Sequence, residues 1–265
     1  MTIRPLCFAV ENDHYEAAKL LIEHGANVNA CNAFRPLVFQ CAMCKRSDMV
    51  KLLVTNGATI NIQTLGRSII YDLTYDPDMI RWIIDNGADV NLVTRNTRPL
   101  QDIYTYRNDI NHNAYEVVSI LLSKGAKADI NAKDDMGNTP LHKSITTRHP
   151  DYKYIKLLID NGANINSKDN AGRTALYRAC DKYYPNSTVV KLLIENGADV
   201  NIRAHNGMSP LYEASRHNYL DIVKLLVEGG ADLTIKHKNK TALDIAKYYS
   251  KKCKDVVEYL QMLAS

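Results

Sequence analysis

Apolar residues recur along the chain in short blocks that end in nearly the same letters. Four close versions of one block, the last being KLLIENGADVN, occupy Lys51–Asn61, Arg81–Asn91, Lys156–Asn166 and Lys191–Asn201. Around the last version, residues 189 to 194 form a broad apolar face at helical spacing. Asn-Gly then ends the helix, because glycine readily adopts the left-handed conformation of a helix C-terminus. The pattern predicts a short helix in each block, followed by an extended turn.

Gly-Ala dipeptides mark the length of the repeating unit. They begin at intervals of 30 to 38 residues, at Gly25, Gly57, Gly87, Gly125, Gly162, Gly197 and Gly230. A period of roughly 33 residues is typical of proteins built from stacked repeats. One such unit is too small to bury enough apolar surface to offset its chain entropy. Neighbouring units must therefore cover one another.

The start of a unit is clearest in DDMGNTPLH, at Asp134–His142. Thr139 is placed to cap a helix, and Pro140 stands at the first helical position, where its missing N–H costs nothing. A first helix, a turn and a second helix then follow. Each unit is predicted to be a hairpin, a helix, a turn and a helix.

The tetrad Thr139-Pro-Leu-His142 resembles the signature of the ankyrin repeat. Its variants stand at Ser209–Tyr212, Thr174–Tyr177 and Thr241–Asp244, and with the Gly-Ala ends they extend the resemblance over essentially the whole chain. The resemblance implies an all-α ankyrin-repeat solenoid of about eight units joined by β-hairpin turns. The chain is also similar to the divergent ankyrin proteins of large DNA viruses (poxviruses, giant viruses) and of intracellular bacteria.

On this pattern, residues 1–265 form a single ankyrin-repeat domain. Its units are expected near 1–29, 30–61, 62–91, 92–129, 130–166, 167–201 and 202–233, with a C-terminal cap at 234–265. The cap has no Gly-Ala, and its charged side is typical of a terminal unit. Arg4-Pro-Leu-Cys7 stands where the first tetrad belongs, so unit 1 is either a degenerate cap or the remainder of a truncated array.

Long inserts set units 4 to 6 apart. They lie at 102–114, 146–152 and 181–187, and they carry Tyr104, Tyr106, Tyr152, Tyr183 and Tyr184. Insertions in repeat arrays emerge as loops on one face, often the binding face. Neutral drift is the alternative, because extra loop length costs little.

Composition restricts the function classes. The chain has a net charge of +4, six cysteines with no disulfide-like spacing, and no apolar run long enough to span a bilayer. Its first residues lack the order of a secretory signal. These features predict a cytoplasmic protein, in the host cytoplasm if the chain is a viral or effector protein, with no membrane association.

Catalytic and metal-binding motifs are missing from the sequence. There is no phosphate-binding, dinucleotide, zinc-protease or nucleophile-elbow motif, so no catalytic, cofactor or metal site is predicted. His142 belongs to the tetrad, where the family uses histidine structurally. Cys41 and Cys44 form one close pair, whereas a structural zinc site usually takes two, and a buried thiol is the alternative.

The resemblance also implies where a partner binds. Ankyrin proteins bind partners along the concave side, through the hairpin tips and the exposed positions of the first helices. Carried onto units 6 to 8, this gives a basic stripe suited to an acidic surface or peptide; its predicted partner-binding residues are Lys168, Arg173, Lys182, Arg203, His205, Met208, Arg216, His217 and Lys240. A solvated face that keeps the array soluble is the alternative.

These observations predict a monomeric, non-catalytic scaffold for protein–protein interaction. By resemblance to viral and bacterial proteins, the partner is a host protein that is inhibited or presented for ubiquitination, although no F-box-like segment follows Leu263. A nucleic-acid-binding module that uses the basic stripe is the alternative function. The resemblance also makes Asn91 and Asn201 candidate substrates of an asparagine hydroxylase.

Overall fold

The computed structural model describes residues 5–29, 31–32, 35–62, 64, 67–93, 100, 103, 113–147, 149–183, 185–249 and 254–264. The chain divides into two compact units, Met1–Ala128 and Asp129–Ser265. From here on they are called unit 1 and unit 2, and the single repeating segments are called repeats. Both are built from consecutive helix pairs, so the predicted helical repeat architecture is confirmed. The bounds of the eight repeats, and their union in one domain, stay predictions.

Unit 1 contains helix pairs and one short hairpin. Its helices are α1 (Pro5–Glu11), α2 (Tyr15–Glu23), α3 (Leu37–Met43), α4 (Ser47–Thr55), α5 (Ile69–Asp72), α6 (Pro77–Asp85) and α8 (Ala114–Ser123). Strands β1 (Cys31–Asn32) and β2 (Arg35–Pro36) pair antiparallel, with Cys31 opposite Pro36. The first helices contact in order, α1 with α3 and α3 with α5.

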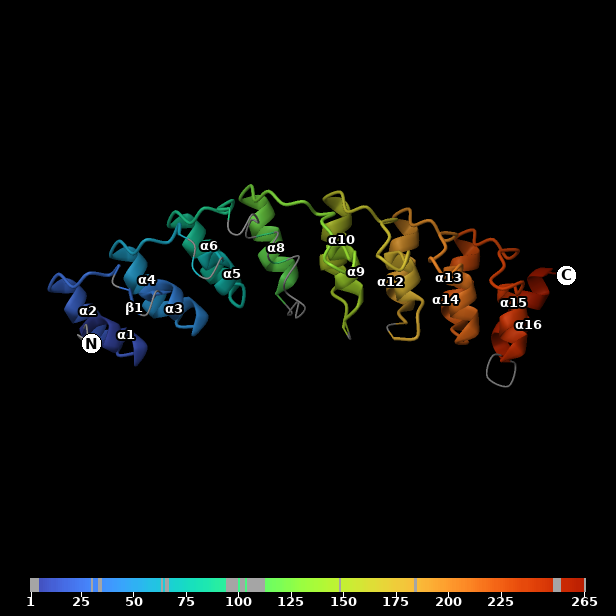
Figure 1. The fold of residues 1–265 in the computed structure, drawn as a ribbon, viewed down its shortest axis with the longest axis horizontal. Helices are drawn as coiled ribbons and strands as arrows, with labels where there is room; N and C mark the ends of the chain where they lie inside the picture. The colour runs from blue at the N-terminus through green and yellow to red at the C-terminus, as the bar shows by residue number, and fades with distance from the viewer. Residues whose placement is uncertain are drawn as a thin grey trace. The chain divides into compact units, whose positions relative to one another are not determined.

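Unit 2 repeats the same arrangement four times. Its helices are α9 (Pro140–Ile145), α10 (Tyr152–Asp160), α11 (Ala175–Ala179), α12 (Ser187–Glu195), α13 (Pro210–Arg216), α14 (Leu220–Glu228), α15 (Ala242–Tyr248) and α16 (Lys254–Ala264). Helix pairs lie side by side in chain order (Figure 1), with α9, α11, α13 and α15 in successive contact. Among the second helices, α12 contacts α14 and α14 contacts α16.

The core of unit 2 lies between neighbouring helix pairs. Val190 and Leu193 of α12 and Leu226 of α14 are fully buried in one cluster that runs through the unit. These are the apolar positions of the repeated block, so the pattern that predicts a helix also supplies its buried face. Each pair is therefore stabilised mainly by its neighbours, as expected for a repeat array.

The ends of the helices follow the predicted chemistry. The side chains of Thr174, Ser209 and Thr241 accept hydrogen bonds from the third residue of the following helix. Asn196 caps the C-terminus of α12, and Gly197 follows with φ +89°. Side-chain caps and a left-handed glycine thus satisfy backbone groups that a short helix leaves without partners.

The asparagine that closes each block joins one repeat to the next. Asn201 Nδ2 donates to the carbonyl of Gly230 at 3.1 Å, and Asn201 Oδ1 accepts from the backbone N–H of Asp232 at 2.8 Å. Asn91 makes the equivalent pair of bonds to Gly125 and Lys127. The amide is therefore a clamp between consecutive Gly-Ala turns, a role that the sequence pattern did not reveal.

Candidate functional site

A pocket opens between two consecutive hairpin turns of unit 2, and residues of α11 and α13 contribute to its lining. Its volume is about 400 Å³. Tyr177 of α11 is one of its lining residues, and we call it the Tyr177 pocket. It contains three of the predicted partner-binding residues, Arg173, Lys182 and His205. The full lining is Asn170, Ala171, Arg173, Tyr177, Asp181, Lys182, Tyr183, His205, Asn206 and Glu213.

A change in the charge pattern accompanies the pocket. In the repeat of α9, Asp134 of the hairpin forms an ion pair of 3.3 Å with Lys143 of the helix. In the next repeat, Asp169 pairs with Arg178 at the same two positions. The repeat of α13 has Ala204 and Glu213 there, so the pair is lost and both side chains are shorter than an arginine. Of these two residues, Glu213 lines the pocket.

Asp169 organises the hairpin side of the pocket. Its carboxylate is almost fully buried, and it accepts bonds from the backbone N–H and the Nε of Arg173, both at 2.9 Å. Arg178 Nε adds a bond of 3.1 Å. Burial by itself raises the pKa of Asp169, but these donors outweigh it and lower the pKa to about 2. The charge of Arg173 is therefore already balanced within the chain.

Glu213 forms the floor of the pocket. Its side chain is buried, and Tyr177 donates its hydroxyl to Glu213 Oε2 at 3.4 Å. His217 Nε2 lies 3.1 Å from Oε1, and Arg216 Nη1 lies 3.9 Å from Oε2. Burial, and then the charge of Glu213, raise the pKa of the Tyr177 hydroxyl. Two predicted cationic residues of the stripe, Arg216 and His217, thus face an acid.

Asp181 is a second acid at the pocket wall. It is only 9% exposed, and its Oδ1 accepts from the backbone N–H of Tyr183 at 2.7 Å. Within the described part of the chain, its carboxylate forms no ion pair and its Oδ2 accepts no hydrogen bond. The ammonium of the neighbouring Lys182 lies instead 4.8 Å from the centroid of the Tyr183 ring, which is 68% exposed.

The remaining predicted residues lie around the pocket or apart from it. Lys168 Nζ donates to the carbonyl of Arg203 at 3.2 Å and so links two hairpin turns. Met208 Sδ lies 3.8 Å from the hydroxyl oxygen of Tyr177, as a weak hydrogen-bond acceptor. Lys240 lies over the ring of Tyr248, 4.3 Å from its centroid, and is not part of the pocket lining.

Sequence reasoning missed the buried half of the site. Tyr177 occupies the histidine position of its tetrad, and Glu213 occupies the position of Lys143 and Arg178. The loss of the Asp…Lys/Arg spacing in one repeat was the available signal. Two insert residues are exposed, Tyr152 at the first position of α10 and Tyr183 in a turn, whereas Tyr104, Tyr106 and Tyr184 lie outside the described residues.

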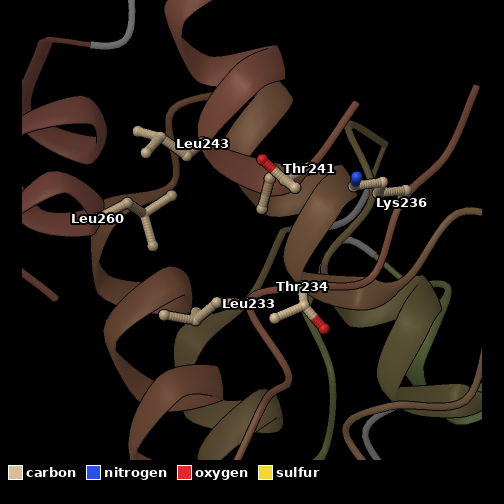
Figure 2. A pocket seen from close by; sticks show the side chains of 7 residues that line it. Leu233, Thr234, Lys236, Thr241, Leu243 and Leu260 are labelled. Atoms are coloured by element: carbon tan, nitrogen blue, oxygen red, sulfur yellow. The ribbon is translucent and has the colours of Figure 1, made fainter. Parts of the chain in front are cut away.

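A second, apolar pocket of about 500 Å³ lies between α15 and α16 (Figure 2). Leu233, Leu243 and Leu260 surround it. The equivalent residues one repeat earlier, Val200, Leu211 and Leu226, are buried in the core of unit 2. This pocket is continuous with the aliphatic core and includes none of the predicted partner-binding residues.

His142 and Cys41 have structural environments. His142 is buried; its Nδ1 accepts the backbone N–H of Thr139 at 3.2 Å, which leaves Nε2 to donate to the carbonyl of Arg173 at 3.0 Å. Cys41 is buried in α3, and burial raises the pKa of its thiol to about 12. In the described part of the chain, no cluster of potential metal ligands occurs. No described helix has the length and apolar content needed to cross a membrane.

The two candidate hydroxylation sites are engaged in the stack. Both side-chain amides, of Asn91 and of Asn201, bond the next Gly-Ala turn through Nδ2 and Oδ1. Their modification stays a prediction.

Comparison with known proteins gives consistent results. The family described as ankyrin repeats (three copies) matches residues 2–64, 69–169, 109–204 and 182–264. An ankyrin repeat protein of fowlpox virus is 27% identical over 164 residues, which are 60% of this chain and 82% of that protein. An ankyrin repeat protein of Acanthamoeba polyphaga mimivirus is 34% identical over 163 residues, 56% of this chain and 37% of that protein.

Proposed function

The chain belongs to the ankyrin-repeat family, and from that premise we propose that it is a non-catalytic scaffold that binds a partner protein. The supporting observation is the Tyr177 pocket, which brings Arg173, Lys182 and His205 together between two hairpin turns. Such a scaffold acts through surface complementarity, because rigid repeats hold variable side chains at fixed positions and a few anchors supply most of the affinity.

The partner is proposed to present an acidic surface or peptide to the hairpin side of unit 2. Lys168, Lys182, Arg203 and Lys240 form no ion pair among the described residues, so these four cations are available to a partner. Charges at the edge of an interface steer association and set its salt dependence. Arg173 and Arg216 contribute less, because Asp169 and Glu213 already balance their charge.

The partner is further proposed to be a host protein, bound by a monomeric chain in the host cytoplasm. The support is the similarity to ankyrin repeat proteins of fowlpox virus and mimivirus. Binding either blocks the host protein directly or presents it for ubiquitination by machinery that the repeats themselves do not supply.

The test compares two charge-reversal variants in host-cell lysate and then with the purified partner. The groove variant carries Lys182→Glu and Arg203→Glu, and the control carries Lys156→Glu and Lys191→Glu on the second helices α10 and α12. The groove variant is expected to bind the captured partner about tenfold more weakly, mainly through slower association. The control should stay within about twofold of the parent chain.

Equal binding by both variants would remove the hairpin side as the interface. Turnover of any substrate by the purified chain would contradict the non-catalytic scaffold.

A further inference from the structure

Asp181 is only 9% exposed and forms no ion pair among the described residues, and its second carboxylate oxygen is open to the solvent of the pocket. Buried carboxylates are normally paired or fully hydrogen-bonded, because removing a charge from water is costly. Asp181 has one backbone donor, the N–H of Tyr183, and a second oxygen without one among the described residues. It lines a pocket that is open to solvent, so the missing donor can come from another molecule.

Two of the cations around the pocket already face acids within the chain. Arg173 bonds Asp169, and Arg216 lies against Glu213. Lys182 lies over the Tyr183 ring. Neighbouring repeats have Thr146 and Arg216 at the position of Asp181, so the acid is particular to this repeat.

Resting on the proposed function, we infer that the Tyr177 pocket receives one basic side chain of the partner protein, an arginine in preference to a lysine. Asp181 Oδ2 accepts its hydrogen bond, and Tyr183, which is 68% exposed and has Lys182 over one face of its ring, supplies the other face. Glu213 lies in the same lining, but its carboxylate already contacts Arg216, His217 and the Tyr177 hydroxyl, so Asp181 is the acceptor for the arginine.

Arginine suits this lining better than lysine. Its guanidinium is planar, so it can stack on an aromatic ring while donating in its own plane to a carboxylate. Lysine has a compact, strongly hydrated charge, and its burial costs more. The side-chain amides of Asn170 and Asn206, also in the lining, offer acceptors for the remaining donors.

The surrounding cations restrict the sequence around that arginine. Lys182 and Arg203 are exposed beside the pocket and repel a uniformly basic segment. A segment with acidic residues on both sides of one arginine satisfies the rim and the pocket together. The partner is thus expected to carry a basic anchor within an acidic stretch.

The first experiment uses a capped peptide as the probe. Acetyl-Glu-Ala-Arg-Ala-Glu-amide is titrated into the isotope-labelled full chain, in parallel with a twin in which citrulline replaces arginine. Citrulline keeps the size and shape of the side chain but has no charge. The arginine peptide is expected to shift the amide signals of Asp181, Tyr183 and Asn206, and to bind about tenfold more tightly than its twin.

Two variants connect the preference to the acid. Asp181→Asn is expected to remove the difference between the two peptides, whereas Asp221→Asn, the same charge change on α14, should preserve it. Thermal unfolding confirms that both variants are folded, and Asp181→Glu supplies a folded variant that keeps the charge. Equal binding of the two peptides to the parent chain, or an unchanged preference in Asp181→Asn, overturns the inference.

Selection of random twelve-residue peptides on the full chain separates this inference from the proposed function. Enrichment of one arginine flanked by acids, lost with Asp181→Asn, supports the inference. Acidic sequences without a basic residue overturn it and leave the acidic-partner proposal standing. If the arginine peptide binds but lysate yields no partner, the pocket is assigned and the proposed function fails.

Discussion

At the residue scale, His142 shows how one side chain joins two repeats. Its ring accepts from Thr139 at the start of its own helix and donates to the carbonyl of Arg173 in the next repeat. The bond to Nδ1 requires the neutral imidazole, because a protonated ring would have a donor there, and the proton of the neutral ring then lies on Nε2. Burial is the main cause that lowers the pKa of His142 below its ordinary value.

This environment predicts a dependence of stability on pH. Because the folded-state pKa is lowered, the unfolded chain binds more protons below about pH 6.5, so the free energy of unfolding falls as pH drops through that value. His142→Gln should lose this component and cost about 1–3 kcal/mol at neutral pH through unsatisfied buried groups. Urea unfolding at several pH values measures both effects. The exposed His24→Gln is the matched control, and an equal pH response in both variants would contradict the assignment.

At the element scale, the hairpin turns of unit 2 are connected by backbone hydrogen bonds. The N–H of Asn170 donates to the carbonyl of Met136 at 3.0 Å, and the N–H of His205 donates to that of Ala171 at 2.9 Å. Gly172, with φ +75°, lies so close to His205 that a Cβ would stand 2.6 Å from its backbone nitrogen. This approach sets the spacing of the turns that form the Tyr177 pocket.

Two glycine substitutions separate conformational strain from this contact. Gly197→Ala changes a left-handed residue with open space around it, and it should cost roughly 1–2 kcal/mol of unfolding free energy. Gly172→Ala adds a clash with the next turn, so it should cost more and weaken binding at the Tyr177 pocket. Urea unfolding and the peptide titration measure the two consequences. Equal costs for both variants would show that the turns separate freely.

At the scale of the whole molecule, part of the positive charge of unit 2 lies against buried acids and does not form one continuous basic field. The net charge is only +4; Asp169 contacts Arg173 and Arg178, and Glu213 contacts Arg216 and His217. Attraction of nucleic acid depends on many uncompensated cations. The charge pattern therefore favours a protein partner over the nucleic-acid alternative.

Duplex DNA or RNA is accordingly expected to bind weakly and without base preference. Any binding seen at about 50 mM salt should disappear by about 200 mM, because backbone contacts depend on counterion release. Fluorescence anisotropy with two unrelated oligonucleotides measures this, and the Lys182→Glu, Arg203→Glu variant serves as the comparison. Sequence-selective binding that survives 200 mM salt would reverse the preference between the two functions.

Local chemistry made much of the fold predictable. The Thr139 and Pro140 start of α9 and the Asn196-Gly197 end of α12 were confirmed, because caps and left-handed glycines act within a few residues of chain. The clamp made by Asn201 was not predicted, since its partners lie 29 and 31 residues away. The ion pair between Arg216 and Glu213 was also not predicted, although the two residues are only three positions apart.

The sequence by itself determined the repeat, its helix ends and its family, because each depends on a pattern of neighbouring residues that recurs along the chain. Only the tertiary structure decided which cations are available. Arg173 and Lys182 look alike in sequence, but one is held by Asp169 and the other rests on an exposed ring. The net field of a cation depends on the distance to its counter-charge, and even for residues four apart, such as Asp169 and Arg173, that distance is set by the folded conformation of the hairpin turn.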